Sequence, residues 1–309
     1  MWKGYPLAPS SVERKIRRQL PVTRFIQTVM PFPLARWLLK QVMPGVKLPA
    51  DITREPVSAD GVRCEWLVPK NSPKDQILLY LHGGGFVFGM TPPHLEMVAT
   101  LARKMDIRTL MVDYRLAPEH PFPAPLDDCI AAYRWLLKLG ISAQNIVVAG
   151  DSAGGNLTIT TMMKLRDSGV PLPAAAACLS PVANLSHRDS PGIGFKDPLL
   201  PRKAGKLYNE SYVGHNDAHD PMISPVFGDW HGLPPLLVHA GEDEILREDA
   251  IRIEELAKAA GVDVRLEIYP RMWHVFQLYL KLPQAVQSLD DIAGFLKSHL
   301  GLVKQRHPG

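Results

Sequence analysis

Short apolar runs and longer amphipathic segments alternate along the chain from about residue 62 onward. The apolar runs have the length and aliphatic character of strands, and they fall at residues 63–69, 77–82, 108–114, 145–150, 175–180, 235–241 and 263–270. Apolar residues recur at helical spacing in residues 94–105, 126–140, 153–169, 246–261 and 283–299. This alternation predicts an α/β fold, in which right-handed crossovers build a mostly parallel sheet with helices on both faces.

Two stretches depart from the alternation. Residues 1–50 contain short helical pieces that prolines interrupt, with one predicted break at Pro21, and residues 183–230 are rich in Pro, Gly and Asp. An irregular insertion of that length inside a regular α/β chain is more often functional than idle. We therefore expect residues 51–309 to form the α/β domain, and residues 1–50 together with the insertion to form a helical cap.

Composition narrows the class of protein. Hydrophobic residues make up 46% of the chain and charged residues 21%, which is typical of a soluble globular protein, and no stretch predicts stable membrane insertion. The net charge is +4 and cations cluster only at residues 13–18, so we expect no nucleic-acid partner. Three separated cysteines, Cys64, Cys129 and Cys178, lie in apolar surroundings and predict buried thiols in a reducing compartment. Because the first twenty residues also lack a secretory signal, the expected location is the cytoplasm.

One predicted strand ends on a serine between small residues. The sequence Gly150-Asp151-Ser152-Ala153-Gly154 matches G-x-S-x-G, follows a strand and precedes a helix, which is the context that gives this motif its meaning. A sharp strand-to-helix turn strains the residue at its tip and needs small neighbours for clearance. The pattern predicts that Ser152 projects from the carboxyl edge of the sheet as a nucleophile, although a five-residue match also occurs by chance.

A second glycine-rich stretch follows the strand at 77–82. In His82-Gly83-Gly84-Gly85-Phe86, three consecutive glycines allow backbone N–H groups to approach a ligand closely. An oxyanion hole needs such N–H groups where a carbonyl oxygen becomes negative. A glycine-rich turn or phosphate nest is the alternative, but a phosphate loop would also need a Gly-Lys-Ser/Thr sequence, and none follows.

An activated serine needs a base within hydrogen-bond reach and a carboxylate that orients the base. Among 11 histidines, His274 follows a predicted strand and precedes the last helix, and the carboxyl-rich turn at 241–249 follows the preceding strand. The chain order serine, acid, histidine is that of α/β-hydrolases. His215 and His219 have a spacing that could bind a metal on a helix, but they lie in the irregular insertion and no further ligands accompany them.

The motifs together resemble the hormone-sensitive-lipase family of bacterial and archaeal carboxylesterases, also called family IV, of the α/β-hydrolase superfamily. The resemblance spans about residues 60–300 and is carried by HGGGF, GDSAGG, DYRLAPEHPFPAPLDD at 113–128 and DPMISP at 220–225. It implies an α/β-hydrolase fold whose N-terminal helices and insertion form a cap over the active site. It also implies roles for five residues: Ser152 as nucleophile, His274 as general base, and the amides of Gly84, Gly85 and Ala153 as the oxyanion hole.

The acid departs from the family pattern. Family members commonly read Asp-x-Leu-Arg-Asp after the strand, and alignment on Leu246-Arg247 places Glu244 at the catalytic position. The same register aligns His274 without a gap. We favour Glu244 and keep Asp243 as the alternative, because a one-residue shift of the loop would give Asp243 the role and either carboxylate can orient an imidazole.

These residues predict a serine carboxylesterase that acts on a small-molecule ester through an acyl-enzyme, with no metal and no cofactor. Phe86 and Phe88 are expected in the substrate pocket, whose bulk favours short- to medium-chain acyl groups. The alternatives are a non-catalytic small-molecule-binding protein on the same fold, or an amidase, lactonase or acyltransferase using the same triad. The final strand and helix offer an edge through which a homodimer could form.

Overall fold

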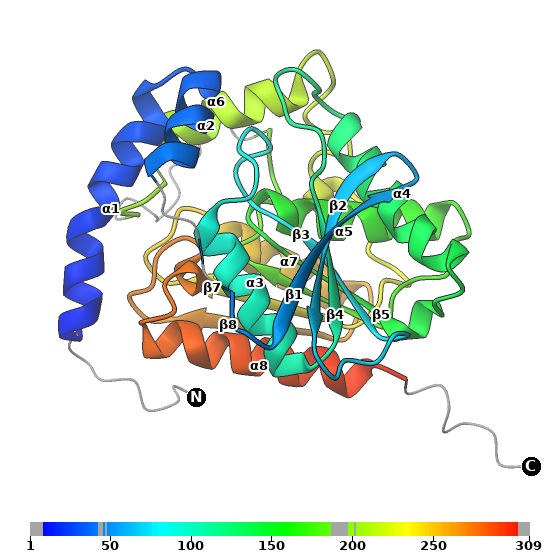
Figure 1. The fold of residues 1–309 in the computed structure, drawn as a ribbon. Helices are drawn as coiled ribbons and strands as arrows, with labels where there is room; N and C mark the ends of the chain where they lie inside the picture. Colours follow the sequence, from blue (N-terminus) through cyan, green and yellow to red (C-terminus); the bar gives the residue numbers. More distant parts are fainter. Residues whose placement is uncertain (1–8, 43–45, 47, 187–196, 201, 302–309) are drawn as a thin grey trace, which may run out of the picture.

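Eight strands form one twisted sheet in the order β1-β2-β4-β3-β5-β6-β7-β8 in a computed structural model that describes residues 9–42, 46, 48–186, 197–200 and 202–301 (Figure 1). The strands are β1 (Ile52–Ala59), β2 (Val62–Pro69), β3 (Ile77–Leu81), β4 (Arg108–Val112), β5 (Ile146–Asp151), β6 (Ala175–Leu179), β7 (Leu236–Gly241) and β8 (Val264–Tyr269). Strand β2 pairs antiparallel with β1 and β4, and all other pairs are parallel. The predicted α/β-hydrolase fold class is thereby confirmed.

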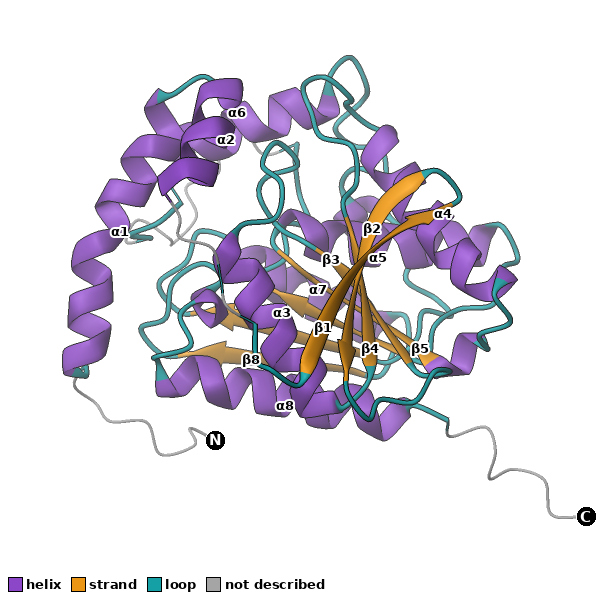
Figure 2. Cartoon of the chain, in the orientation of Figure 1, coloured by secondary structure: helices purple, strands orange, loops and turns teal. Residues whose placement is uncertain are grey.

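Helices cover both faces of the sheet (Figure 2). One face packs against α3 (Pro92–Met105) and α8 (Pro283–His299), and the other against α4 (Ala124–Lys138), α5 (Ala153–Asp167) and α7 (Arg247–Ala259). Short 3₁₀ turns lie at Ala143–Asn145, Pro225–Phe227 and Phe276–Leu278.

The central strand β3 shows why these runs are uninterrupted in sequence. Ile77, Leu79 and Leu81 point to one core, while Leu78 and Tyr80 point to the other, because successive side chains of a strand face opposite sides. All five are completely buried. A strand covered on both faces therefore needs apolar residues at every position.

Two sequence-based expectations about local structure are wrong. Strand β1 was not predicted, because it lies at the edge of the sheet with mostly exposed side chains and carries Pro56, so it lacks an apolar pattern. The predicted break at Pro21 does not occur, since helix α1 (Ser11–Val29) continues through it. A proline removes one helical hydrogen bond, and the buried Ile16 and Leu20 anchor α1 against the rest of the molecule.

Three helices outside the α/β core gather on the carboxyl side of the sheet: α1, α2 (Phe32–Val42) and α6 (Arg202–Val213) (Figure 1). They come from the two irregular stretches of the sequence, although residues 1–8, 43–45, 47, 187–196 and 201 of those stretches lie outside the described part. The rings of Phe32 on α2 and Tyr208 on α6 both contact Phe88 of the loop after β3. None of the helices in the described residues is long and apolar enough to cross a membrane.

Candidate active site

Ser152 occupies the tip of the turn between β5 and α5. Its backbone has φ 53° and ψ −116°, a strained conformation for a residue with a side chain. The surrounding glycines make the turn possible, because a Cβ atom on Gly154 would collide with the carbonyl oxygens of Leu81 and His82 at the end of β3. The strand and helix therefore pack closely enough to hold the serine at the carboxyl edge of the sheet.

The imidazole of His274 lies against this serine. His274 belongs to the turn after β8, and its Nε2 atom is 2.9 Å from the Oγ atom of Ser152. The two residues are 7% and 8% exposed, so the pair is shielded while still reaching a cavity. The distance allows Nε2 to accept the serine proton directly.

Glu244, in the turn after β7, lies behind the histidine. Its Oε2 atom is 3.7 Å from Nδ1 of His274, which is within ion-pair range but longer than the roughly 2.7–3.2 Å of a hydrogen bond. Asp243 points elsewhere: its Oδ2 atom accepts a hydrogen bond of 2.7 Å from Arg17. Of the two carboxylates considered as the acid, the structure brings Glu244 to the imidazole.

Ser180 is a member of this cluster that the sequence reasoning missed. Its hydroxyl donates a 2.6 Å hydrogen bond to Oε2 of Glu244 and accepts one of 3.0 Å from the amide of Val275. It follows β6, the strand between the one that carries Ser152 and the one that precedes Glu244. A polar residue at the carboxyl end of that strand was the available signal, since parallel strands end at the same edge.

The buried pair of Glu244 and His274 has shifted pKa values. Burial raises the pKa of Glu244 above its ordinary value, and its contacts with His274 and Ser180 offset this only in part. Burial lowers the pKa of His274, but the facing Glu244 carboxylate outweighs burial, so the net shift of the His274 pKa is upward. The histidine is therefore held as a stronger base than a free imidazole.

The glycine loop after β3 lies beside the serine. Gly84 and Gly85 have φ values of 121° and 60°, and a Cβ atom on Gly85 would overlap the ring of Tyr208. Within the described residues, no hydrogen bond occupies the N–H group of Gly84 or Gly85. With Ala153, the first residue of α5, these amides lie at the rim of the site where a negative oxygen could be bound.

Asp151 joins this loop to the serine turn, and the sequence reasoning also missed it. Its Oδ1 atom accepts hydrogen bonds from Tyr80 (2.7 Å) and the amide of Gly83 (3.0 Å), and its Oδ2 atom lies 3.2 Å from Nε2 of His94. Burial raises the pKa of Asp151, but His94 and the donated hydrogen bonds outweigh burial and lower the net pKa. The carboxylate thus fixes the glycine loop relative to Ser152.

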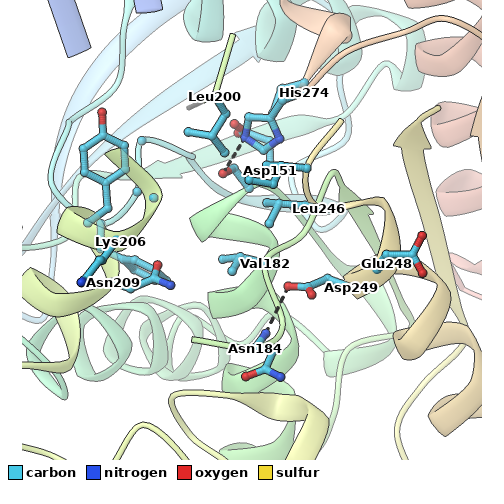
Figure 3. Close-up of a pocket in the computed structure, with 18 of the residues that line it drawn as sticks. Asp151, Val182, Asn184, Leu200, Lys206, Asn209, Leu246, Glu248, Asp249 and His274 are labelled. Atoms are coloured by element: carbon cyan, nitrogen blue, oxygen red, sulfur yellow. Dashed lines mark hydrogen bonds between the residues drawn. The ribbon is translucent and has the colours of Figure 1, made fainter. Parts of the chain in front are cut away.

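A cavity of about 890 Å³ opens above Ser152 and His274 (Figure 3). Both predicted pocket residues line it: Phe88, and Phe86, whose ring is stacked on Tyr212 with centroids 3.7 Å apart. Away from the serine, polar side chains contribute to the wall, including Asn184, Lys206, Asn209, Glu248 and Asp249. The cavity is large enough for an ester whose acyl and alcohol parts differ in polarity.

Of the two insertion histidines considered as metal ligands, His219 lines this cavity and His215 does not. His219 is exposed and its Nδ1 atom is 3.0 Å from Asp217, and both His215 and His219 follow the end of α6 instead of sharing a helix. In the described part of the chain, no group of three or more His, Cys, Asp or Glu side chains is arranged to hold a metal ion.

Comparison with known proteins adds the following. The family described as alpha/beta hydrolase fold matches residues 78–278. An acetyl-hydrolase of Streptomyces hygroscopicus is 38% identical over 77% of this chain and 80% of its own, and an esterase of Acinetobacter venetianus is 35% identical over 79% and 81%. The crystal structure of an esterase from the bacterial hormone-sensitive lipase family superposes with a TM-score of 0.86 at 37% identity, covering 96% of this chain and all of that one.

Proposed function

The chain belongs to the α/β-hydrolase fold family, as do its bacterial esterase relatives of the hormone-sensitive-lipase family, and it is a carboxylic ester hydrolase. We propose that it cleaves short- to medium-chain acyl esters. In this proposal Ser152 is the nucleophile, His274 the base and Glu244 the acid. The 2.9 Å contact between Ser152 Oγ and His274 Nε2 carries the proposal. It supplies the geometry that proton transfer from serine to imidazole requires.

The reaction proceeds in two acyl transfers. Ser152 Oγ attacks the ester carbonyl while His274 Nε2 takes its proton, and the tetrahedral oxyanion is bound by the amides of Gly84, Gly85 and Ala153. Collapse of this intermediate breaks the bond to the alcohol oxygen, which receives the proton from His274. Water then attacks the acyl-enzyme, gives a proton to His274, and releases the carboxylic acid as Ser152 regains its proton.

Glu244 serves as the acid because of its burial and its position. The imidazolium formed in each step carries a positive charge in a site that excludes water, so a facing carboxylate stabilises it. Ser180 holds the Oε2 atom of Glu244 in place through a 2.6 Å hydrogen bond. Asp243 instead accepts a 2.7 Å hydrogen bond from Arg17.

The acyl preference and the cap are parts of the same proposal. Helices α1, α2 and α6 form a cap over the carboxyl edge of the sheet, with α6 supplying Tyr208 above Gly85. Phe88 and Leu278 also line the cavity. A wall of large side chains near Ser152 supports short to medium acyl chains.

Hydrolysis of p-nitrophenyl esters from C2 to C16 tests the function. The wild type is expected to prefer the short chains, and Ser152→Ala is expected to lose kcat by about 10⁶-fold, leaving a residual rate from the oxyanion hole and binding. An inactive wild type, or a variant as active as the wild type, would contradict the proposed serine mechanism. Equal rates on C4 and C16 esters would remove the chain-length preference alone.

We further propose a cytoplasmic location, a small ester as substrate and no nucleic-acid partner. Cys64, Cys129 and Cys178 are buried and free, which supports a reducing compartment. A homodimer through the edge strand β8 is proposed on the half-exposed Ile268 of that strand. Sedimentation of a monomer at micromolar concentration would remove the dimer from the proposal.

A further inference from the structure

The turn that carries Glu244, residues 242–246, is hydrogen-bonded on both sides to segments that are remote in sequence. We call it the acid turn. On one side, Arg17 of α1 donates a 2.7 Å hydrogen bond to Oδ2 of Asp243. On the other side, Oδ2 of Asp197, from the insertion, accepts a 3.1 Å hydrogen bond from the amide of Ile245. Glu244 therefore lies between two residues that are each anchored to a different part of the cap.

Arg17 also contacts the turn that carries His274, residues 270–275, which we call the histidine turn. Its guanidinium donates to the carbonyl oxygen of Arg271 and lies 5.2 Å from the centroid of the Trp273 ring. Trp273 is completely buried and directly precedes His274. One guanidinium thus bridges the two turns whose separation sets the distance between Glu244 and His274.

A buried carboxylate keeps Arg17 in this position. Glu13, one helical turn earlier on α1, is 1% exposed, and its Oε1 atom lies 3.4 Å from Nε of Arg17 and 3.5 Å from Nε of Arg271. A buried carboxylate is strongly destabilising without such partners. Ile16 and Leu20 of α1 join Trp273 in one apolar cluster, so apolar burial reinforces the ionic contact.

The two carboxylate oxygens of Asp197 bind different segments, one its own local turn and the other the acid turn. Asp197 is 5% exposed, and its Oδ1 atom accepts hydrogen bonds from the amides of Leu199 (2.8 Å) and Leu200 (3.0 Å). The local turn therefore fixes one oxygen and directs the other to Ile245. Arg24 of α1 donates a 3.4 Å hydrogen bond to the carbonyl oxygen of Asp197, which links the two anchoring segments.

We propose that Arg17 and Asp197 are positioning residues of the esterase, which hold the acid turn from the two cap segments and thereby set the alignment of Glu244 with His274. The proposal rests on the triad of the proposed function. The Nδ1–Oε2 distance of 3.7 Å exceeds the roughly 2.7–3.2 Å of a hydrogen bond, so a displacement of the acid turn by about half an ångström decides whether that bond forms. Docking of the cap is in this way coupled to the basicity of His274.

The direction in which the pH profile shifts when Arg17 is replaced distinguishes a positioning role of Arg17 from a purely electrostatic one. The charged groups that raise the pKa of His274 are Glu244, Asp197 and Asp151. A positive charge near an imidazole has the opposite effect, so any effect of the Arg17 charge on this pKa is downward. Loss of the Arg17 charge alone would therefore raise the pKa of His274. Loss of the contact with Glu244 would lower it. The nearby charges of Glu13, Glu242, Asp243 and Arg271 stay in place in both cases.

The test compares Arg17→Met with Arg18→Met, which removes the same charge from an exposed neighbour on the same helix. We expect Arg17→Met to lose kcat on p-nitrophenyl butyrate by about tenfold or more, with little change in KM, and to move the acid limb of kcat/KM to lower pH. Arg17→Lys keeps a cation for Asp243 and should recover part of the loss. Arg18→Met should behave as the wild type.

Other outcomes overturn the proposal. In the first, kcat of Arg17→Met equals that of Arg18→Met. In the second, kcat of Arg17→Met falls but the acid limb of kcat/KM stays unchanged or moves to higher pH. If Arg17→Met does not fold, Asp243→Asn removes the same ion pair from the acid turn and is judged by kcat, because the loss of a negative charge would by itself move the acid limb to lower pH. Esterase activity that needs Ser152 but ignores Arg17 would reject the positioning role alone, whereas an inactive wild type would reject the proposed function.

Asp197→Asn tests the second anchor. The asparagine oxygen can still accept from Leu199 and Leu200, but its NH₂ group then faces the amide of Ile245, donor against donor. We expect a loss of kcat of about tenfold, measured at a temperature well below the unfolding transition because two unpaired buried donors also lower thermal stability. Unchanged kcat would show that this contact does not position the acid turn.

Discussion

Replacement of Glu244 by glutamine is the sharpest test of the triad, because it keeps the shape of the side chain and removes its charge. The hydroxyl of Ser180 already accepts from Val275, so its proton needs the oxygen of residue 244 as acceptor. The same Oε2 atom also lies 3.7 Å from Nδ1 of His274, so the glutamine oxygen keeps both contacts and only the negative charge is lost. The imidazolium that forms when Nε2 takes the serine proton then lacks a facing negative charge.

The expected loss follows from the lost charge. Loss of the acid in a serine triad costs about 10⁴-fold in kcat when the tautomer is also wrong, so with the tautomer kept we expect a smaller loss of about 10²- to 10³-fold for Glu244→Gln. The acid limb of kcat/KM should also move. In the wild type Glu244 raises the pKa of His274, so loss of the Glu244 charge should move this limb to lower pH.

The assay is steady-state hydrolysis of p-nitrophenyl butyrate between pH 5 and 9. Glu255→Gln is the matched control, because it makes the same substitution at an exposed position on α7. A Glu244→Gln variant that keeps its kcat within tenfold of the control, or keeps the wild-type acid limb, would refute the reasoning. If Asp243→Asn instead lost as much activity as Ser152→Ala, the acid would be Asp243.

Two further predictions concern residues near the triad. Ser180→Ala removes the donor to Glu244 and the acceptor for Val275, so we expect kcat to fall about tenfold and the free energy of unfolding in urea to fall by about 1–3 kcal/mol; a variant identical to the wild type in both would contradict the role of this hydroxyl. Burial raises the pKa of Asp249 to about 6, so the folded state binds its proton more tightly than the unfolded state and stability falls as pH rises from about 4 to 6. Asp249→Asn, whose oxygen still accepts from the adjoining loop, should weaken that fall, and denaturant unfolding at pH 4 and pH 7 measures it; equal slopes in both proteins would contradict the shift.

The sequence was most informative where local pattern and fold agree. The strands from β3 to β7 are buried on both faces, so their apolar runs stand out, and the α/β-hydrolase class followed from their alternation with helices. Strand β1 lacks this pattern because the edge of a sheet leaves most of its side chains in water. Pro21 was misinterpreted for a related reason: the tertiary burial of Leu20 outweighs a local propensity.

At the site, motifs predicted the residues that lie on one continuous segment, and geometry was needed for the others. Ser152 and the glycine loop have fixed spacing from their strands, so their positions could be predicted. The choice between Asp243 and Glu244 depends on one residue of loop register, and adjacent side chains in a turn point in different directions. Ser180 carries no motif, since its contact with Glu244 joins residues 64 positions apart.

The positions of Ser152 and His274 in the sheet explain why the histidine turn needs an anchor. Ser152 follows β5, which has strands on both sides and a helix packed directly after the turn, so the fold itself fixes it. His274 follows β8, the last strand, whose side chains are mostly half-exposed and which has a neighbour on one side only. Such a turn has fewer contacts to restrain it.

Helix α1 supplies the missing wall at this edge. Leu20 packs into the cluster that contains Met272 and Trp273, and Arg17 reaches both the acid turn and the histidine turn. In the proposed triad the nucleophile is fixed by the core, whereas the base and the acid depend on the proposed cap. The enzyme should therefore lose kcat before it loses its fold when α1 is loosened. Mild urea should therefore lower kcat at concentrations where the fluorescence and circular dichroism of the core are unchanged. In Arg17→Met this loss of kcat should occur at lower urea concentrations. Parallel loss of activity and core structure in both proteins would contradict this dependence.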